Sequence, residues 1–216
     1  MPGDEVLAPD PALVALWVRG WSLCRGAPAP HPVDGGWRVE VGWPDQRARL
    51  VFPTVCDGLA RAAREITEPF VFLKLCGPVE ALRPLLPARW QAEPRGWMMT
   101  IDEVWGEPAA PPAGYVAAME DAGQVRIVRM LTGDGETAAS GRVGLSGGVA
   151  VFDRIATEVP HRRRGLASAV MRSLQACARD RGARGGVLVG TDMGRRHYES
   201  LGWRVHTPYA SAVIPG

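Results

Sequence analysis

Residues 155–168 constrain the fold more than any other segment, because a strand, a turn and a helix that begins at a glycine follow one another there. A long strand is expected at 149–159, before the turn, and residues 165–180 carry apolar side chains at helical spacing. An apolar stripe of this kind predicts a helix that packs on a sheet. The segment therefore predicts an α/β layer architecture.

The start of this helix has the features of a phosphate-binding site. The first amide groups of a helix have no partner within the helix, and the helix dipole adds about half a positive charge there. Gly165 and Ala167 leave the backbone open to a ligand, and the three arginines Arg162–Arg164 add charge. The amides of residues 163–168 therefore predict a diphosphate site. For the arginines taken alone, a solvated basic turn or a nucleic-acid contact remains an alternative.

At these residues the sequence resembles the GNAT superfamily of acyl-CoA N-acyltransferases. The phosphate loop of that family reads Arg/Gln-x-x-Gly-x-Gly/Ala, and the segment from Arg162 to Ala167 matches it. A second family motif reads roughly Asn-x-x-Ala-x-x-x-Tyr-x-x-x-Gly-Phe, and residues 191–203 are similar to it. Its tyrosine, glycine and aromatic positions are in register, whereas Thr191 and Gly194 replace the usual Asn and Ala.

The resemblance covers residues 114–216 and implies a GNAT-like α/β (α+β) fold, with a mixed, mostly antiparallel sheet flanked by helices. It implies N-acetyltransferase activity, in which the primary amine of a small molecule or peptide attacks acetyl-CoA directly in a ternary complex. Acetyl-CoA is the expected acyl donor, and no metal is expected. The residues expected to bind acetyl-CoA are Ile155, Ala156, Thr157, Arg162, Arg163, Arg164, Gly165, Leu166, Ala167, Ser168 and Thr191.

Two residues are candidates for moving protons. Tyr198 matches the family position that protonates the departing CoA thiolate; the alternative is a core tyrosine that packs behind its helix. Asp153 is our candidate general base, because strand alternation places it on the same face as Ile155. The alternative for Asp153 is a structural carboxylate paired with a neighbouring arginine.

Periodicity and turn residues predict the remaining elements. Helices are expected at 11–25, 57–66, 79–86, 165–180 and 192–200, and strands at 37–42, 47–52, 70–76, 97–101, 124–131, 137–145, 149–159, 186–190 and 203–213. The stretch 107–114 is rich in Pro and Gly and predicts a linker. We therefore expect an N-terminal region at 1–107, a linker at 108–113 and the acetyltransferase domain at 114–216.

The N-terminal region is predicted to be either a degenerate second copy of the same half-fold or a divergent part of one domain. Residues 56–60 are similar to residues 163–167 at the start of a helix, which favours a tandem arrangement. In that copy the carboxylate of Asp57 replaces the basic turn. The chain is then expected to bind one acyl-CoA.

The net charge of +2 divides into −3 for residues 1–112 and +5 for residues 113–216. This division indicates an anionic ligand on the C-terminal side, although statistical scatter remains an alternative.

No apolar run reaches the roughly 18 residues of a membrane helix, and Met1–Glu5 is acidic where a secretory signal is basic. We expect a bacterial, cytoplasmic protein without a membrane partner.

Two other functions would use the same basic turn. A non-catalytic acyl-CoA-binding sensor or regulatory protein would use the same loop without chemistry at Tyr198. Nucleic-acid binding is not expected, because no aromatic residues interleave with the arginines as stacking platforms. The four cysteines and four histidines form no metal-ligand spacing. The amine acceptor is expected to be a small molecule, the protein a monomer or homodimer, and Trp37, Trp43 or Trp105 free to line a pocket.

Overall fold

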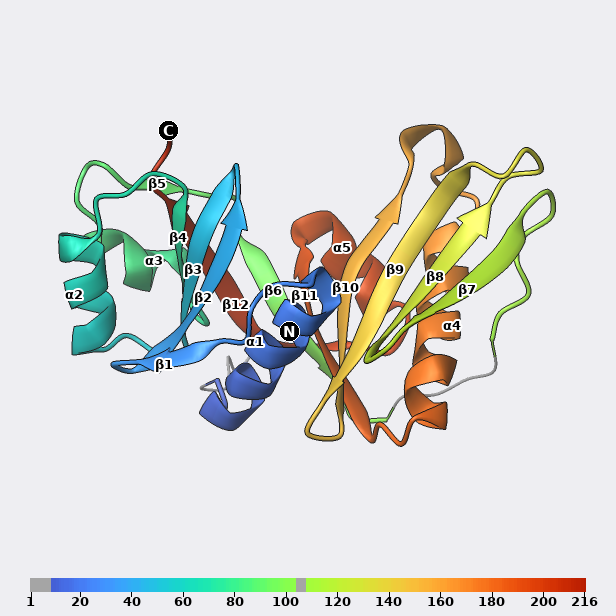
Figure 1. Ribbon diagram of the computed structural model, residues 1–216, viewed down its shortest axis with the longest axis horizontal. Coiled ribbons are helices and arrows are strands. Elements are labelled where there is room, and N and C mark those ends of the chain that lie inside the picture. Colours follow the sequence, from blue (N-terminus) through green and yellow to red (C-terminus); the bar gives the residue numbers. More distant parts are fainter. Residues whose placement is uncertain (1–8, 104–107) are drawn as a thin grey trace, which may run out of the picture. The chain divides into compact units, whose positions relative to one another are not determined.

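The computed structural model describes residues 9–103 and 108–216 (Figure 1). Residues 1–5, Trp105 and Glu107, the first residue of the Pro- and Gly-rich stretch, lie outside the described part of the chain, so the predictions made for them are not addressed by the structure. The chain forms two compact units. The first consists of Met1–Thr100 with Val189–Gly216, and the second of Ile101–Leu188.

The first unit contains most of the N-terminal elements together with the C-terminal helix and strand. Its elements are α1 (Pro11–Arg25), β1 (His31–Val33), β2 (Gly36–Trp43), β3 (Gln46–Phe52), α2 (Asp57–Glu65), β4 (Val71–Leu75), α3 (Val79–Leu82), a 3-10 turn (Arg83–Leu85), β5 (Gln91–Ala92), β6 (Gly96–Ile101), α5 (Asp192–Glu199) and β12 (Arg204–Val213). The strand order is β1-β2-β3-β4-β12-β6, and β5 also pairs with β12. Only β3 and β4 run parallel among the strand pairs of this unit that are described here.

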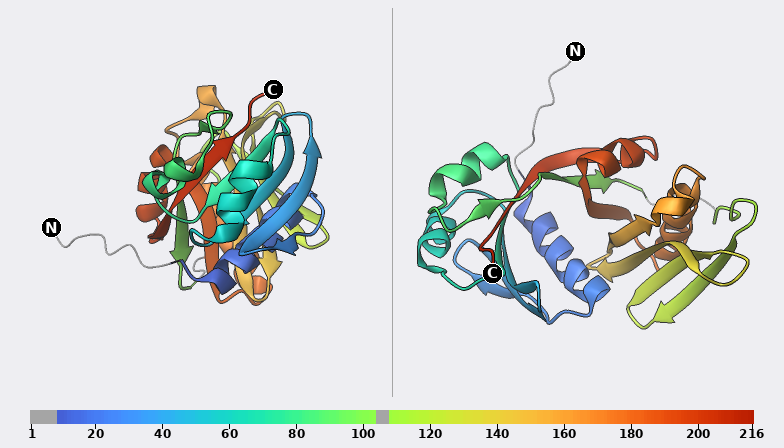
Figure 2. Two further views of the ribbon diagram at one scale, coloured as in Figure 1. Left: turned by 90° about the vertical axis from the view of Figure 1, so that its left-hand side faces the viewer. Right: turned by 90° about the horizontal axis from the view of Figure 1, so that it is seen from above.

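Both faces of this sheet are covered by helices. Helices α2 and α3 lie on one face of the sheet (Figure 2). Their side chains pack with those of β3, β4 and β12 into an apolar core that includes Leu59, Leu73 and Leu82. Helix α1 covers the other face, where Trp17 meets Tyr209 of β12 edge-on at 5.4 Å between ring centroids. Burial of large apolar side chains on both faces is the main force that holds the unit together.

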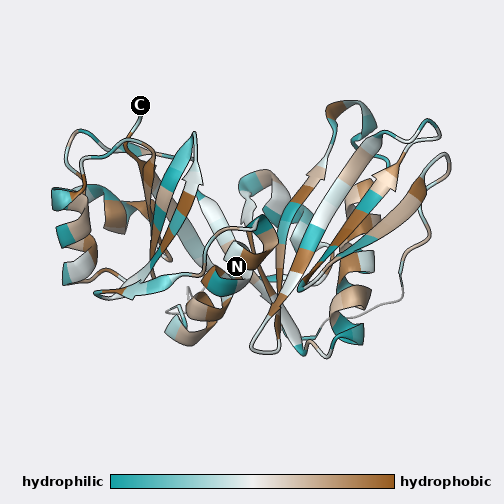
Figure 3. Cartoon of the chain, viewed as in Figure 1, coloured by the Kyte–Doolittle hydropathy of each residue, from teal (hydrophilic) through white to brown (hydrophobic). Residues whose placement is uncertain are grey.

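The second unit is a meander of antiparallel strands followed by a parallel crossover. Its elements are β7 (Val116–Ala122), β8 (Val125–Leu131), β9 (Thr137–Ser146), β10 (Val149–Thr157), a 3-10 turn (Val159–His161), α4 (Leu166–Asp180) and β11 (Gly185–Thr191), whose last three residues belong to the first unit. The strand order is β11-β10-β9-β8-β7, with β10 and β11 parallel. Figure 3 shows hydrophilic and hydrophobic residues alternating along β8 and β9, as expected of a sheet with one covered face.

Helix α4 packs closely on β9 because Gly141 has no side chain. A Cβ at Gly141 would lie 2.8 Å from side-chain atoms of both Val170 and Leu174. Val170 and Leu174 are fully buried, as the apolar stripe predicted. This contact fixes the helix against the sheet and so positions the turn that precedes it.

The predicted fold class, a mixed and mostly antiparallel sheet flanked by helices, is confirmed. The predicted helices and strands all occur, with ends shifted by a few residues, and α3 is shorter because Arg83–Leu85 continues as a 3-10 turn. Sequence patterns missed β1, β5 and β7. Strand β7 is missed because its side chains are mostly exposed and do not alternate.

Each unit contains two adjacent parallel strands connected through a helix: β3–α2–β4 in the first and β10–α4–β11 in the second. The proposed division into 1–107, 108–113 and 114–216, and the tandem interpretation, stay predictions. No helix in the described part of the chain is long and apolar enough to span a membrane.

Candidate functional site

The strand that leads to the predicted phosphate loop is interrupted by a β-bulge. Asp153 of β10 lies opposite Arg142 of β9, but the next paired residue is Ala156, opposite Ser140. Within the bulge, Arg154 has a positive φ of 54°, which is uncommon for a residue with a side chain. Bulges concentrate next to active sites, where they redirect the strand.

The bulge changes which side chains share a face. Ile155 lies on the side of α4, because its Cγ1 is 3.3 Å from the Cβ position of Gly141. Asp153 pairs with Arg142, the neighbour of Gly141, and therefore points to the opposite face. The expectation that Asp153 and Ile155 share a face is wrong, because simple strand alternation does not hold across the extra residue.

The end of β10 extends beyond its parallel partner. Pairing between β10 and β11 runs from Val149 opposite Gly185 to Phe152 opposite Leu188. The predicted ligand-binding residues Ile155–Thr157 follow this paired part, and Ile155 and Thr157 are half-buried. A strand end that has passed its neighbour can hydrogen-bond an extended ligand as an added strand.

The helix that follows begins without a side-chain cap. The N-cap of α4 is Gly165, at a φ of 79°, and no side chain accepts from the first amides. The first backbone bond of the helix is donated by Ala169 to Gly165, at 3.1 Å. The amides of Leu166, Ala167 and Ser168 therefore point out of the helix end.

Two left-handed residues shape the turn before these amides. Arg163 has a positive φ of 60° and Gly165 a positive φ of 79°, whereas Arg164 between them does not. Successive residues of opposite backbone handedness form a concave nest of N–H groups. Together with the positive end of the helix dipole, this geometry suits an anion such as a diphosphate. The residues present thus fit the predicted ligand on backbone geometry as well as on charge.

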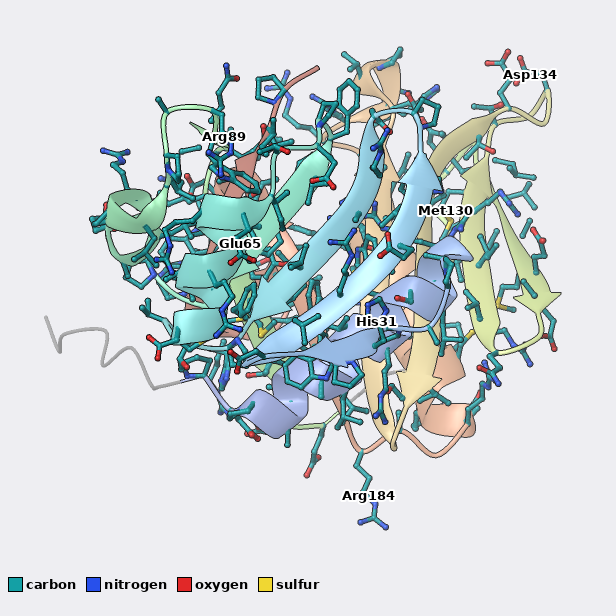
Figure 4. All side chains as sticks on the ribbon, turned by 60° about the vertical axis from the view of Figure 1, so that its left-hand side comes forward. His31, Glu65, Arg89, Met130, Asp134 and Arg184 are labelled. Carbon is teal, nitrogen blue, oxygen red and sulfur yellow. The ribbon has the colours of Figure 1, made fainter. Side chains whose placement is uncertain are left out.

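The arginines of the turn have different partners. Arg162 donates from Nε to the carbonyl oxygen of Thr157, at 3.2 Å, which ties the turn back to the end of β10. Arg164 donates from Nη1 to the hydroxyl of Tyr115, at 3.2 Å. Arg184, beyond the C-terminal end of α4, extends into solvent away from the ribbon (Figure 4).

The residues of the second motif lie in the first unit. Thr191 is the N-cap of α5, and its Oγ1 accepts from the amide of Gly194 at 3.2 Å. Tyr198, the seventh residue of α5, is 8% exposed and lies 6.4 Å from Trp203 between ring centroids. A Cβ at Gly194 would lie 3.1 Å from Cε2 of Tyr198, so the glycine at this position leaves room for the tyrosine ring.

Helix α5 is fastened at its first residue. The Asp192 carboxylate accepts from Nε1 of Trp97, at 2.6 Å, and from Nε of Arg95, at 3.1 Å. The hydrogen bond from Trp97, followed by that from Arg95, lowers the pKa of Asp192. These contacts hold the helix that carries Tyr198 against the start of β6.

The second unit therefore brings together Ile155–Thr157 and the turn Arg162–Ser168, while Thr191 and Tyr198 belong to the first unit. Two residues next to the turn were not among those predicted: Tyr115 and His161. His161 directly precedes the arginines, so its position in the sequence could have suggested it. Tyr115 is distant in sequence, and no pattern indicated it. Among the described residues, no group of three His, Cys, Asp or Glu side chains is placed to hold a metal ion.

Comparisons with known proteins identify the fold. No protein-family model matches the chain, and no curated protein matches it. Among solved structures, a GCN5-related N-acetyltransferase from Kribbella flavida matches with a TM-score of 0.67 at 16% identity, over 98% of this chain and 97% of that one. A GCN5-related N-acetyltransferase from Sphaerobacter thermophilus matches with a TM-score of 0.58 at 14% identity, over 97% and 95%.

A tandem GNAT protein from the clavulanic acid biosynthesis pathway is also similar, with a TM-score of 0.54 at 14% identity, over 78% of this chain and 75% of that one. At these identities the likeness is one of fold. The chain thus has the fold of the GNAT acetyltransferases, as the two sequence motifs predicted.

Proposed function

We propose that this chain is an N-acetyltransferase that transfers an acetyl group from acetyl-CoA to the primary amine of a small molecule or peptide. The observation that carries the proposal is the uncapped start of α4 behind a bulged strand, with the nest formed at Arg163 and Gly165. An anion site at the end of an exposed strand edge suits a ligand with a diphosphate and an extended amide-bearing arm, which is the chemistry of CoA.

The amides of residues 163–168 are proposed to hold the diphosphate, with the side chains of Arg162 and Arg164 beside it. The backbone of Ile155–Thr157 is proposed to hold the pantetheine arm, whose amides can bond as a neighbouring strand does. Bound acetyl-CoA supplies a thioester carbonyl that the amine attacks directly in a ternary complex. Holding both reactants in line can supply about 7–11 kcal/mol of the barrier.

The bond changes require two proton transfers. The new bond joins the amine nitrogen to the acyl carbon, the carbon–sulfur bond breaks, and CoA leaves as a thiol. Tyr198 is proposed, from its place in the second motif, to donate the proton to the sulfur. Asp153 is still proposed to take the proton of the amine, directly or through water, from the face of β10 opposite Ile155. A lysine-like amine has a solution pKa near ~10.4, so it must lose a proton before it attacks.

The N-terminal unit is proposed to bind no second acyl-CoA. Helix α2 is the element that would correspond to α4 in a tandem arrangement. A Cβ at Gly58, in its first turn, would lie 1.8 Å from the carbonyl oxygen of Asp34. The turn after β1 therefore packs directly on the first turn of α2, and we propose that this contact leaves no room for a phosphate there. A calorimetric stoichiometry of one acetyl-CoA per chain is expected, and a stoichiometry of two would refute this part of the proposal.

A thermal-shift series with acetyl-CoA and longer acyl-CoAs, followed by thiol release with a panel of amines, tests the activity. Acetyl-CoA is expected to raise the Tm, and at least one amine is expected to accelerate thiol release over hydrolysis. The other candidate is a non-catalytic acyl-CoA-binding sensor, for which the buried position of Tyr198 is the favouring observation. Binding without amine-dependent thiol release would identify that function instead. We further propose a bacterial, cytoplasmic protein that acts as a monomer or homodimer.

A further inference from the structure

The phosphate-binding turn is held from outside by a side chain that precedes strand β7. Tyr115 lies at the end of a tight turn in which its amide donates to the carbonyl of Pro112, at 3.1 Å. Gly114 occupies the third position of this turn with a φ of 85°, a conformation that favours glycine there. The turn is short and closed by a local hydrogen bond, so it sets where the backbone of Tyr115 lies.

That place is beside the start of α4. The position of a Cβ on Gly165 is 3.8 Å from Cγ of Pro112, so the Pro112–Tyr115 turn lies in van der Waals contact range of the N-cap. The Tyr115 hydroxyl is 2.9 Å from Nδ1 of His161, and the two rings meet edge-on with 5.7 Å between centroids. His161 ends the 3-10 turn that directly precedes the arginines.

Two hydrogen bonds connect the side chains of Arg164, Tyr115 and His161. Arg164 can only donate, and its Nη1 donates to the oxygen of Tyr115 at 3.2 Å. We assign the hydroxyl hydrogen of Tyr115 to Nδ1 of His161, which accepts it when the imidazole carries its proton on Nε2; with the proton on Nδ1, the ring would donate to Tyr115 instead. Tyr115 thus bridges the two sides of the basic turn. It contacts His161, which directly precedes the three arginines, and Arg164, which is the last of them.

We infer that Tyr115 is a positioning residue for the acyl-CoA site: its hydroxyl holds His161 and Arg164 so that the turn 161–165 keeps the conformation in which its amides converge on the diphosphate. The inference rests on the proposed function, since it assigns a role toward the same ligand. The physical reason is preorganisation. Arg163 and Gly165 both occupy left-handed conformations, and a turn that is already ordered loses less entropy when the ligand binds.

Calorimetry with acetyl-CoA on Tyr115→Phe tests the inference. The variant keeps the ring and its edge-on contact with His161 and removes only the hydroxyl. The Kd of acetyl-CoA is expected to rise roughly three- to tenfold, the range for loss of one hydrogen bond. The kcat at saturating acetyl-CoA is expected to stay unchanged, since Tyr115 acts on binding. An unchanged Kd would overturn the inference.

A double-mutant cycle shows whether Tyr115 acts through Arg164. Tyr115→Phe, Arg164→Gln and the double variant are compared for acetyl-CoA affinity. Because both substitutions break the same contact, their effects are expected to be less than additive. Additive effects would show that the hydroxyl does not act through the guanidinium and would overturn the proposed connection.

Two variants serve as matched controls. Tyr209→Phe removes the hydroxyl of another tyrosine, one that finds no hydrogen-bond partner in the described part of the chain. Arg181→Gln removes an arginine that holds the backbone carbonyl of Gln124, at 3.0 Å, near the other end of α4. Both are expected to keep the wild-type Kd. A rise in Kd for either control equal to that of Tyr115→Phe would assign the effect to general destabilisation and overturn the inference.

A ligand-free measurement separates this inference from the proposed function. The chain has four histidines, so the imidazole ¹⁵N signals of His161 can be assigned with a His161→Gln variant. Wild-type protein is expected to show Nδ1 as a hydrogen-bond acceptor, and Tyr115→Phe is expected to shift that signal. If His161 is unaffected, the contact is refuted whatever the activity is. If His161 shifts and wild-type protein binds no acetyl-CoA, the proposed function fails and the role of Tyr115 toward acyl-CoA fails with it.

Discussion

Gly165 and Gly182 lie just before and just after helix α4 and have nearly the same left-handed backbone, with φ values of 79° and 81°. Gly165 is the N-cap, at the proposed phosphate site. Gly182 follows the C-terminal end, where a Cβ would meet no atom within 4 Å. The same substitution at both glycines therefore imposes the same backbone strain, but only at Gly165 does the new side chain lie at the proposed phosphate site.

We expect Gly165→Glu to abolish measurable acetyl-CoA binding, because its carboxylate meets the diphosphate. Gly182→Glu is expected to bind with wild-type affinity. Both variants place a side chain at positive φ and should lose a similar free energy of unfolding, about 1–2 kcal/mol. Calorimetry measures the affinity, and thermal unfolding measures the shared strain. Wild-type affinity in Gly165→Glu would remove the phosphate-loop assignment.

Tyr198→Phe is expected to lower kcat by about 10²–10⁴ while the Kd of acetyl-CoA stays the same, if the hydroxyl protonates the leaving thiolate. The phenylalanine keeps the ring contact with Trp203 and the space beside Gly194. Tyr209→Phe is the matched control, because Tyr209 is also buried, at 5% exposed, and its hydroxyl plays no part in the proposed chemistry. Steady-state turnover with a responsive amine decides the matter. A Tyr198→Phe variant with wild-type turnover would show a structural tyrosine.

Arg89→Ala is expected to destabilise the first unit. Arg89 donates to the carbonyl of Ile66 at 2.7 Å and to that of Ala63 at 2.8 Å, so it binds the C-terminal end of α2, where carbonyls lack helical partners (Figure 4). Loss of these charge-assisted bonds should cost about 1–3 kcal/mol. Urea unfolding provides the measurement. Arg184→Ala, which removes a side chain that extends into solvent, should leave the midpoint unchanged; an equal shift there would count against the proposed role of Arg89.

Lys74, the chain's single lysine, is expected to make stability depend on pH. Burial, followed by the nearby charge of Arg49, lowers the pKa of Lys74 well below its ordinary 10.5, and Nζ of Lys74 donates to the hydroxyl oxygen of Ser211. Unfolding restores the ordinary pKa, so the unfolded chain binds more protons between the two values. Stability should therefore rise with pH across that interval and fall as pH drops through it.

The double variant Lys74→Met with Ser211→Ala removes both polar partners from this buried site. Replacing both partners by apolar groups avoids leaving one of them unpaired, so the Tm at neutral pH should equal or exceed that of the wild type. The difference in stability between variant and wild type should shrink as pH approaches 10.5, the ordinary value for lysine. Thermal unfolding between pH 7 and 10 gives this difference. A difference that is independent of pH would mean that Lys74 titrates normally in the folded chain.

Several parts of the fold follow from short segments of sequence. Asp10 accepts from the amide of Ala12, Pro11 begins α1, and Gly26 ends it at a φ of 63°, so this helix is delimited by residues within and next to it. The turn 162–168 is similar in kind: the glycine at the helix start and the arginines before it are local features. Such signals act over a few residues, which is why sequence patterns located both.

Other parts of the candidate site depend on contacts between distant segments. The bulge in β10 arises from its pairing with β9 and reverses the face on which Asp153 lies relative to Ile155. Side-chain alternation assumes a regular strand, so it cannot reveal an extra residue. Strand β7 escaped prediction for a related reason, since its exposed side chains carry no alternating pattern and it is recognised only by its pairing with β8.

The sequence by itself determined the local elements of this protein: where helices begin and end, and that a glycine-led, arginine-rich turn opens α4. Only the tertiary structure decided which distant residues meet that turn. Tyr115 can contact Arg164 and His161 because the antiparallel meander places the start of β7 and the end of β10 at the same end of the sheet. Backbone propensities are local and can be read in order along the chain, whereas this contact depends on strand register and packing, which the whole sheet sets at once.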